Sequence, residues 1–349
     1  MQERKEKGFR SRISFGIVIV GLLAALIILP YRFASQAGSN DKSGEGLNIR
    51  TTSNVKELEN YDIRADKSAF EKIERFRQNS GESAASIADV RAEFVRGEEI
   101  LRSKVPTLKV EYNTDIRTPE VIAPDVKQGR NFLTSSSGTK RVDILRDFVK
   151  ENEGLFGVSN DQANQLKVLA DYTNPDGNLS FTHLEQRING IPVFRSEVKA
   201  GFTKNGEMIR VINNLAPALQ YESLSGDFRD PLAAVKAAAG HIKYELKAAD
   251  QTINEAASTD LKSVFGSGDW ATTAEKMYFP TEPGVAVPAW RVLIWQPVNA
   301  FYVIVDAETG TMLWRKNITE DQTQSATYQV YNNANAMMDS ADSPAPLTP

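Results

Sequence analysis

The sequence contains no cysteine and only two histidines, and these absences exclude most metal and nucleophile chemistry. Without cysteine there can be neither a disulfide nor a thiolate metal ligand. His183 and His241 lie 58 positions apart (241 − 183), so they cannot form the H-E-x-x-H helix of zinc proteases. His183-Leu184-Glu185 matches the H-x-E of zinc deaminases, but the C-x-x-C that accompanies it there requires cysteine.

Other catalytic signatures are also missing from the chain. There is no G-x-S-x-G elbow for a Ser-His-Asp site and no glycine-rich phosphate loop. Carboxylates are abundant, yet no pair of them stands out as a general acid and base. We therefore predict that this chain is not an enzyme, and that His183 and His241 are structural residues.

The formal net charge of −4 makes nucleic acid an unsuitable partner. Residues 1–37 carry six Lys/Arg and two Asp/Glu, a net of +4, so the remainder carries −4 − 4 = −8. A chain of 349 residues can hold two compact domains with flanking segments.

The N-terminus combines a basic stretch with an apolar run. The run spans residues 13–30, which is longer than the h-region of a signal peptide (about 7–15 residues) and shorter than a typical spanning helix (about 20). Ser35 and Ala37 offer a cleavage point before Gly38. Residues 1–37 are therefore expected to be a signal peptide or a membrane anchor, which makes the protein secreted and extracellular, or anchored through residues 13–30.

A polar linker and then a helical pattern occupy residues 38–105. Apolar residues recur at helical spacing between residues 66 and 104, and Gly81 interrupts them. Two helices, or one broken helix, are expected here.

A second helix is expected over residues 139–157, followed by strands. Thr139 and the serines before it are candidate N-caps, and Gly154 is the candidate C-terminal glycine. Between residues 166 and 214 the apolar period changes to that of strands. Turn dipeptides separate these strands at Asp176-Gly177, Asn189-Gly190 and Asn205-Gly206.

The order of a helix followed by strands then recurs. Asp230-Pro231 opens a helix that is expected to reach residue 247, and strand-like runs follow, with a turn at Thr309-Gly310. The fold class predicted from this repetition is α+β, with two tandem lobes that each pack a helix on an antiparallel sheet. A tail with four acidic residues and no lysine or arginine begins at Thr319.

The hairpin around Asn189-Gly190 leaves two registers open. A two-residue turn pairs Gln186 with Val193, but it divides the apolar residues between both faces of the sheet. We favour a one-residue bulge at the turn, which gives a single apolar face and leaves His183 toward solvent. In either register Gln186 points where its neighbours are apolar, so it is expected to be a buried amide that needs hydrogen-bond partners. That face comprises Leu184, Gln186, Ile188, Phe194, Val198, Ala200 and Phe202.

The stretch "FTHLEQRINGIPVFRSEVKAGFTKNGEMIRVINNLAP" resembles the propeptide domain of fungalysin and thermolysin precursors. The pattern of that domain consists of a glutamine, a Gly-h-x-Val turn (where h is hydrophobic) and a second hairpin. The residues that match it are Gln186, Gly190, Pro192, Val193 and Gly206, with Asn189 completing the turn. The runs "PAWRVLIW" and "FYVIVDAETGTMLWRKNIT" look like a PepSY lobe, and "ATYQVYNNANAMMDSADSPAPLTP" is similar to the start of a mature fungalysin.

The resemblance covers about residues 110–349 and implies cystatin-like lobes. It implies a propeptide-like domain over residues 106–222, a PepSY-like domain over 223–318 and an acidic processing tail over 319–349. Full fungalysin precursors continue into a zinc peptidase domain with H-E-x-x-H, which these 349 residues do not contain. No catalytic or metal-binding residue is therefore inherited here, and zinc is expected only in the catalytic domain.

The function implied is that of a non-catalytic pro-region that assists folding of a metalloprotease catalytic domain and blocks its cleft. The partner can be bound in cis or in trans. Processing is expected between Asn317 and Ala326, near Thr319. An alternative is a stand-alone exported or membrane-anchored inhibitor or binding module that acts in trans. A third is an enzyme that uses only carboxylates, or an unrelated ligand-binding protein.

Overall fold

The computed structural model describes residues 58–129, 131–297 and 299–319. The chain divides into two units, residues 1–56 and 57–349, and the described residues all belong to the second. The apolar run 13–30, the cleavage point at Ser35 and Ala37, and the tail with Ala326 lie outside the described residues. No helix in the described part of the chain is both long enough and apolar enough to cross a bilayer.

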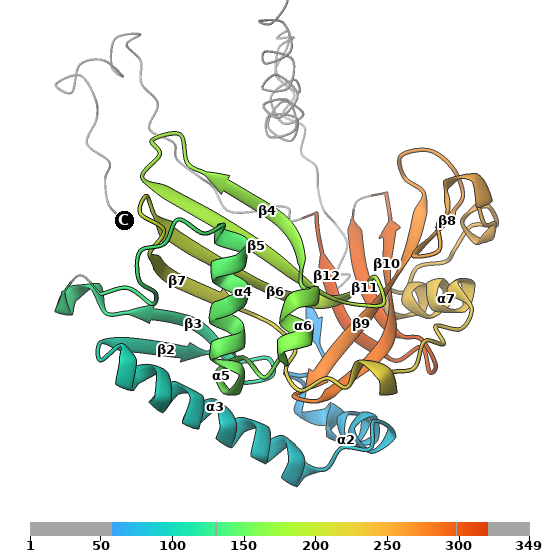
Figure 1. The fold of residues 1–349 in the computed structure, drawn as a ribbon. Coiled ribbons are helices and arrows are strands. Elements are labelled where there is room, and N and C mark those ends of the chain that lie inside the picture. The colour runs from blue at the N-terminus through green and yellow to red at the C-terminus, as the bar shows by residue number, and fades with distance from the viewer. Residues whose placement is uncertain (1–57, 130, 298, 320–349) are drawn as a thin grey trace, which may run out of the picture. The chain divides into compact units, whose positions relative to one another are not determined.

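A continuous mixed sheet of twelve strands organises the described residues, with few helices, so the α+β class is confirmed. The main path runs in the order β1-β12-β11-β10-β9-β6-β7-β3-β2; in addition, β5 pairs with β4 and β6, and β8 pairs with β9 (Figure 1). Neighbouring strands are antiparallel except β6 and β9, which pair in parallel. The strands are β1 (Tyr61–Asp62), β2 (Leu108–Tyr112), β3 (Pro119–Pro124), β4 (Lys167–Thr173), β5 (Leu179–Ile188), β6 (Ile191–Thr203), β7 (Met208–Asn213), β8 (Lys262–Phe265), β9 (Thr272–Glu282), β10 (Val285–Trp295), β11 (Ala300–Asp306) and β12 (Met312–Asn317).

The helices lie on the faces of this sheet. They are α2 (Phe70–Asn79), α3 (Ala84–Lys104), α4 (Arg141–Glu151), α5 (Glu153–Phe156), α6 (Asn160–Gln165) and α7 (Pro231–His241). Short 3₁₀ turns cover Lys67–Ala69, Val126–Gln128, Tyr221–Ser223, Ala249–Gln251 and Glu255–Ala257.

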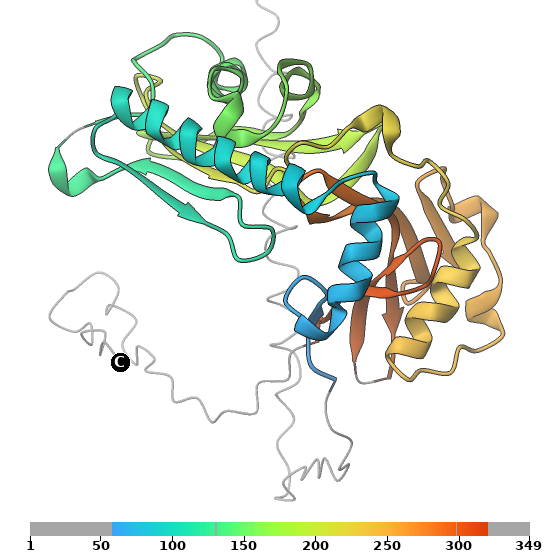
Figure 2. The ribbon, with the colours of Figure 1, turned by 90° about the horizontal axis from the view of Figure 1, so that it is seen from below.

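Strands β2–β7 form what we call the first half-sheet, and α3–α6 lie on one of its faces (Figure 2). The amphipathic helix α4 buries Leu145, Phe148 and Val149 against this sheet. Val198, Ala200 and Phe202 of β6, at alternate positions, contribute to the same core from the sheet side. The expected helix-on-sheet arrangement is therefore present in this part of the chain.

Strands β1 and β8–β12 form the second half-sheet, which has a core on each face. Helix α7 covers one face, where Trp290 is fully buried and its indole nitrogen donates to the Phe228 carbonyl at 2.6 Å. Helix α2 covers part of the other face, where Phe76 and Phe279 belong to a separate buried cluster. The second half-sheet therefore differs from a simple layer of one helix on one sheet.

The expected helix over 139–157 forms, but its ends differ from the prediction. Helix α4 begins after Lys140, which makes no side-chain capping hydrogen bond, and the chain bends at Asn152 before α5. The left-handed C-terminal glycine is Gly157, with φ of 66°, and the assignment of Gly154 is wrong. Gly154 lies inside α5, where it packs against Gly97 of α3; a Cβ on Gly97 would come within 2.6 Å of the Leu155 nitrogen.

Other helix predictions depend on caps that the structure contains. Gly81, with φ of 73°, separates α2 from α3, so the helical segment is two helices. The Asp230 carboxylate accepts hydrogen bonds from the Leu232 and Ala233 nitrogens, and thereby caps α7 as expected. Helix α7 ends at His241, before the predicted end at residue 247.

Two strands were not recognised in the sequence between residues 105 and 138. Prolines mark both ends of β3, and proline normally indicates an edge or an interruption of a strand. Tertiary pairing overrides this local signal, because Val121 and Ile122 of β3 pair with Ile212 and Val211 of β7. Strand β1, with two residues, is too short to produce any periodic pattern.

The three predicted turns share a backbone requirement, and Gly206 has a steric requirement as well. Gly177, Gly190 and Gly206 all have positive φ, of 70°, 82° and 80°. A Cβ on Gly206 would lie 2.1 Å from the Ser137 carbonyl oxygen, whereas a Cβ on Gly177 would meet nothing within 4 Å. The β6–β7 turn is therefore held against the loop that precedes α4, where the Ser137 nitrogen also donates to the Asn205 carbonyl at 3.1 Å.

This difference provides a matched pair of substitutions. Gly177→Ala is expected to lower the free energy of unfolding by about 1 kcal/mol, the penalty for a left-handed residue with a side chain. Gly206→Ala should lower it by about 2 kcal/mol more, because the loop at Ser137 must also move. Urea unfolding of both variants measures this, and equal losses would contradict the close approach.

Candidate functional site at the junction of the half-sheets

The tip of the β5–β6 hairpin belongs to the core of the second half-sheet. Asn189 and Gly190 have φ of 52° and 82°, and the flanking Ile188 and Ile191 pair as in a two-residue turn. After Pro192, strand β6 leaves β5, and Val193 pairs in parallel with Tyr278 of β9. Ile188 and Val193 are both buried beneath α7.

Strand β6 makes an excursion immediately after this tip. Pairing with β5 resumes at Glu185 and Glu197, so the four residues 193–196 lie opposite the single residue Gln186. Arg195 has a φ of 53°, which turns the chain back toward β5. The predicted one-residue bulge at the turn is therefore wrong, because the turn is regular and the irregularity is larger and follows Pro192.

The excursion nevertheless changes which residues of β6 face each side of the sheet after it, as the favoured register required. Leu184 pairs with Val198, and both face the core of the first half-sheet together with Ala200 and Phe202. Ile188 and Phe194 do not share that core, contrary to the prediction. They enter the two cores of the second half-sheet instead.

Phe194 anchors the excursion on the face opposite α7. Its ring stacks on Phe279, with ring centroids 5.1 Å apart, and lies 5.3 Å from the ring of Trp314. The Arg195 guanidinium lies 5.0 Å from the centroid of Trp314, within the range of a cation–π interaction. Val193 and Phe194 thus fasten β6 to opposite faces of the second half-sheet.

The side chain of Gln186, which is 0% exposed, fills the space left by the excursion. Its amide nitrogen donates to the Ala216 carbonyl at 3.1 Å and to the Tyr221 hydroxyl at 2.9 Å. Its amide oxygen accepts from the Ala216 nitrogen at 2.9 Å and from the Ser196 hydroxyl. All four hydrogen-bonding positions of the amide are used, which is what a buried polar group requires.

The partners of Gln186 lie on the segment that connects the two half-sheets. Residues 214–221, which we call the connector, are held on one side by Gly157, whose carbonyl accepts from the Ala218 nitrogen at 2.6 Å. On the other side, the Gly284 nitrogen of the β9–β10 turn donates to the Pro217 carbonyl at 2.9 Å. Burial raises the pKa of Tyr221 despite the hydrogen bond from Gln186, so its hydroxyl remains neutral.

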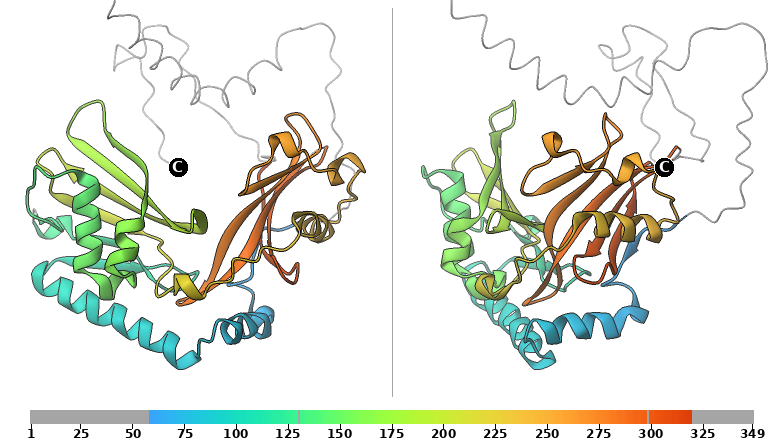
Figure 3. Two further views of the ribbon diagram at one scale, coloured as in Figure 1. Left: turned by 45° about the vertical axis from the view of Figure 1, so that its right-hand side comes forward. Right: turned by 90° about the vertical axis from the view of Figure 1, so that its right-hand side faces the viewer.

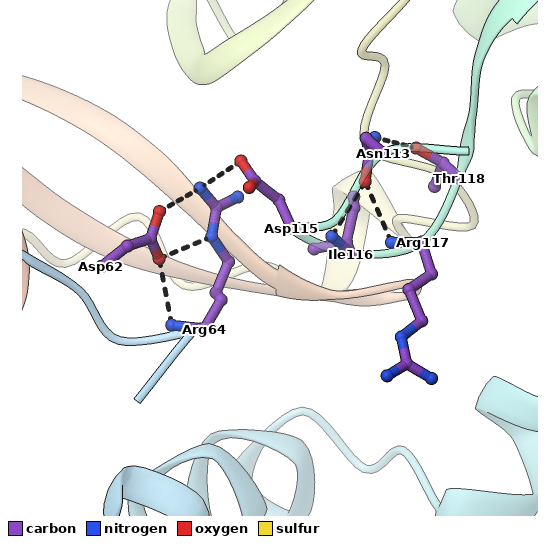
Figure 4. A network of polar contacts seen from close by, with 7 residues as sticks. All are labelled: Asp62, Arg64, Asn113, Asp115, Ile116, Arg117 and Thr118. Atoms are coloured by element: carbon purple, nitrogen blue, oxygen red, sulfur yellow. Dashed lines mark hydrogen bonds and ion pairs between the residues drawn. The ribbon is translucent and has the colours of Figure 1, made fainter. Parts of the chain in front are cut away.

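A second link between the half-sheets is an arginine held by two carboxylates (Figure 4). The Arg64 side chain, only 5% exposed, donates from Nε and Nη2 to Asp62 at 2.9 and 2.7 Å. The same Nη2 lies 2.8 Å from Asp115 in the β2–β3 loop of the first half-sheet. Asn113 shapes that loop, because its side-chain oxygen accepts from the nitrogens of Ile116 and Arg117 at 3.1 and 3.0 Å.

The two histidines make structural contacts. His183 lies 2.8 Å from Glu197, which also pairs with Lys199 at 2.7 Å. Burial raises the pKa of Glu197, but Lys199 and His183 outweigh this effect, and the pKa is lowered overall. His183 is 23% exposed on the face opposite Leu184, and His241 Nε2 lies 2.9 Å from the Gly310 carbonyl.

None of these carboxylates and histidines forms a metal site in the described ranges. No group of three or more His, Asp or Glu side chains there has the geometry to hold an ion. The polar residues of the junction are instead engaged in hydrogen bonds that join segments distant in sequence.

The other residues singled out in the sequence lie apart from the Gln186 network. Gly206 is at the β6–β7 turn, at the far end of β6 from the tip. Asn317 ends β12 and is buried, with its nitrogen donating to Asn60 at 3.0 Å. The Thr319 hydroxyl accepts from the Ala300 nitrogen at 2.9 Å, so the chain is held to the sheet as far as this residue.

Sequence reasoning missed four members of the junction. Ser196 had a usable signal, since it takes an inward position between Phe194 and Val198. Tyr221, Arg64 and Asp115 had none, because their roles depend on partners far along the chain. The hydrogen bond between Gln186 and Tyr221 spans 35 positions, and the ion pair of Arg64 with Asp115 spans 51.

Residues 164–215 match the Fungalysin/Thermolysin Propeptide Motif. This stretch runs from the end of α6 through β4–β7 to the start of the connector, and it includes Gln186, the hairpin tip and the excursion. The match supports a propeptide of the fungalysin and thermolysin type for this part of the chain. Among solved structures, the Bacillus megaterium YpeB C-terminal domain aligns with 64% of this chain and 96% of its own at 10% identity, with a TM-score of 0.24.

Removal of the buried amide tests the Gln186 network. Gln186→Leu should lower the free energy of unfolding by about 3 kcal/mol, because the Ala216 carbonyl loses its hydrogen bond from the amide and the Ser196 hydroxyl loses its acceptor. Gln165→Leu is the matched control at an exposed position of α6 and should change stability by less than about 0.5 kcal/mol. Equal effects in urea unfolding would show that the network does not stabilise the junction.

The arginine link can be tested by contrasting its buried and exposed members. Arg64→Leu should destabilise by about 2 kcal/mol, since it removes charge-assisted bonds from a buried guanidinium and strands two carboxylates. Asp115→Asn, at a carboxylate that is 41% exposed, should destabilise by less than about 1 kcal/mol. Thermal unfolding at several salt concentrations provides the measurement. A larger loss of stability in Asp115→Asn than in Arg64→Leu would contradict the view that the buried guanidinium is the main member of this link.

Proposed function

We propose that this chain is the non-catalytic pro-region of a fungalysin-like zinc metalloendopeptidase, which assists folding of the catalytic domain and blocks its cleft. The observation that carries the proposal is the propeptide motif over residues 164–215. Within that motif, Gln186, Ser196 and the excursion of β6 form one side of the junction between the half-sheets. The side chains of Gln186 and Ser196 are used in structural hydrogen bonds.

The physical basis of such a role is binding to the folded state of the partner. A domain that binds the native protease, and not its unfolded chain, shifts the folding equilibrium by mass action. A covalent tether raises the effective concentration of the two domains, which strengthens binding without any new contact. The junction adds preorganisation, because a continuous sheet presents both half-sheets in a single arrangement and reduces the entropy lost on binding.

The zinc ion of the proposed complex belongs to the partner. The proposal therefore assigns no cofactor to this chain, and its partner is a metalloprotease catalytic domain bound in cis or in trans. Export through the N-terminal segment, cleaved or anchored through residues 13–30, forms part of the same proposal. The proposed localisation of the protein is therefore extracellular or at the outer surface of a membrane.

The processing point is proposed to follow Thr319. Asn317 and Thr319 are hydrogen-bonded to the second half-sheet, and proteases cleave accessible extended chain in preference to a paired strand. The processing point, expected between Asn317 and Ala326, is therefore placed by this proposal in the part of that interval beyond Thr319. Cleavage there would separate the described fold intact from whatever follows it.

The test is inhibition of a zinc endopeptidase by the whole chain. The purified chain should inhibit at least one thermolysin- or fungalysin-type peptidase saturably, at micromolar or lower concentration. Subtilisin, a serine protease, serves as the control, because a chain that acts merely as a competing substrate slows both enzymes. The intact chain, checked by mass spectrometry, should remain uncleaved while inhibition lasts.

A refolding experiment separates assistance of folding from inhibition. The chain should raise the yield of active peptidase from the denatured catalytic domain, and it should do so when added as a separate molecule if it acts in trans. Absence of both effects across a panel of such peptidases would overturn the proposal. Inhibition without any gain in refolding would favour the stand-alone inhibitor.

A further inference from the structure

The face of the first half-sheet away from α3–α6 carries an apolar groove. Figure 3 shows these helices gathered on one side of strands β4–β7, with no described helix on the other side. The groove, about 490 Å³, is lined chiefly by Tyr172, Phe181, Gly201, Ile209 and Ile212. Its size lies within the range of about 300–1,000 Å³ typical of ligand pockets, which suits a few side chains of a peptide.

The apolar residues of the groove are unusually exposed. Tyr172 is 55% exposed, although its ring stacks on Phe181 with centroids 5.4 Å apart. Leu179 at the same end of the hairpin is 36% exposed. Contiguous apolar surface of this kind marks a place where something binds.

Glycine at position 201 keeps the floor of the groove open. A Cβ there would meet only Phe181, at 3.7 Å, which is an ordinary van der Waals contact, and the backbone of Gly201 is not left-handed. The fold therefore tolerates a larger residue at this position. Because Gly201 has no side chain, room is left between Phe181 and Ile209 for a side chain from another segment.

The charged side chains around the groove are cationic. Lys199 and Arg210 line it together with His183, and no carboxylate does. Glu197, just outside, binds Lys199 and His183. Arg210, an exposed residue of β7, has no ion-pair partner among the residues that the structure describes. The surface thus combines an apolar floor with one uncompensated cation, which fits an acidic peptide with aromatic or aliphatic residues.

The sequence after Thr319 has that chemistry. Residues 320–349 include four acids and no lysine or arginine, and they contain the run Ala326-Thr-Tyr-Gln-Val-Tyr331, in which Thr and Gln alternate with apolar and aromatic residues. From β12 to β6 the sheet has four strand spacings, about 20 Å in all, and Gly201 lies eight residues, about 26 Å, along β6 from Val193, where β6 meets β9. Thirty extended residues span at most about 100 Å, so the tail is long enough to reach the groove.

We propose that the acidic tail, residues 320–349, docks in the groove of its own chain through the run 326–331. Apolar side chains of the run fill the space above Gly201, and the acids of the tail interact with Arg210. The tail then shields this face of the first half-sheet. This inference stands apart from the proposed function, since it concerns two segments of a single chain.

Disulfide trapping tests the proposal cleanly, because the natural chain has no cysteine. In the full chain, the pair Ile209→Cys and Tyr331→Cys should form an intramolecular disulfide at least ten times faster than a control pair. The control joins Tyr331→Cys to Lys236→Cys, at an exposed position on α7. Gly201→Cys with Tyr331→Cys provides a second groove pair should the first variant fold poorly.

The charge argument has its own readout in the same assay. Arg210→Glu should slow trapping of the groove pair about three-fold or more, and added salt should reduce this difference by screening. Lys236→Glu, a charge reversal on the far helix, should leave the rate unchanged. Equal trapping of groove and control pairs would overturn the proposal, and so would a disulfide that forms only between two copies of the chain.

Discussion

The side-chain amide of Gln186 forms hydrogen bonds with the backbone of the connector at a point where the strands of the sheet provide no partner. Strand β6 departs from β5 over residues 193–196, and a departure of this kind leaves buried polar groups without ladder partners. The amide supplies a donor and an acceptor to Ala216 and further bonds to Ser196 and Tyr221. Because an unsatisfied buried group costs about 1–3 kcal/mol, the excursion is tolerable only with such a residue opposite it.

The excursion in turn makes the two half-sheets continuous. Val193 reaches the core under α7, and Phe194 reaches the core on the other face, so one strand is clamped from both sides. The Arg64 link joins the half-sheets a second time through the β2–β3 loop. Two separate connections resist both bending and rotation at the junction, so the two half-sheets keep a fixed arrangement.

Polar residues that looked like candidates for chemistry serve this architecture. His183 and Glu197 form a hydrogen bond on the open face, and His241 closes the turn at Gly310 against the end of α7. The same open face carries exposed apolar residues, which a solitary folded domain would ordinarily cover. These exposed residues are the basis for the proposal that the open face binds another polypeptide segment.

The sequence by itself determined the local elements. Asn189-Gly190 and the other turn dipeptides specify positive φ whatever surrounds them, and Asp230 caps α7 through its immediate neighbours. The expected burial of Gln186 also followed from its place in an alternating strand. These features depend on residues within a few positions of one another, which a sequence displays directly.

Only the tertiary structure decided the junction. The parallel pairing of Val193 with Tyr278 joins residues 85 positions apart, and no local pattern anticipates it. The same applies to β3, whose prolines argued against a strand, and to Gly97 inside α3, where the close approach of α5 leaves no room for a Cβ. In each case a contact distant in sequence outweighed a local preference of about 1 kcal/mol, since burial and satisfied hydrogen bonds contribute more.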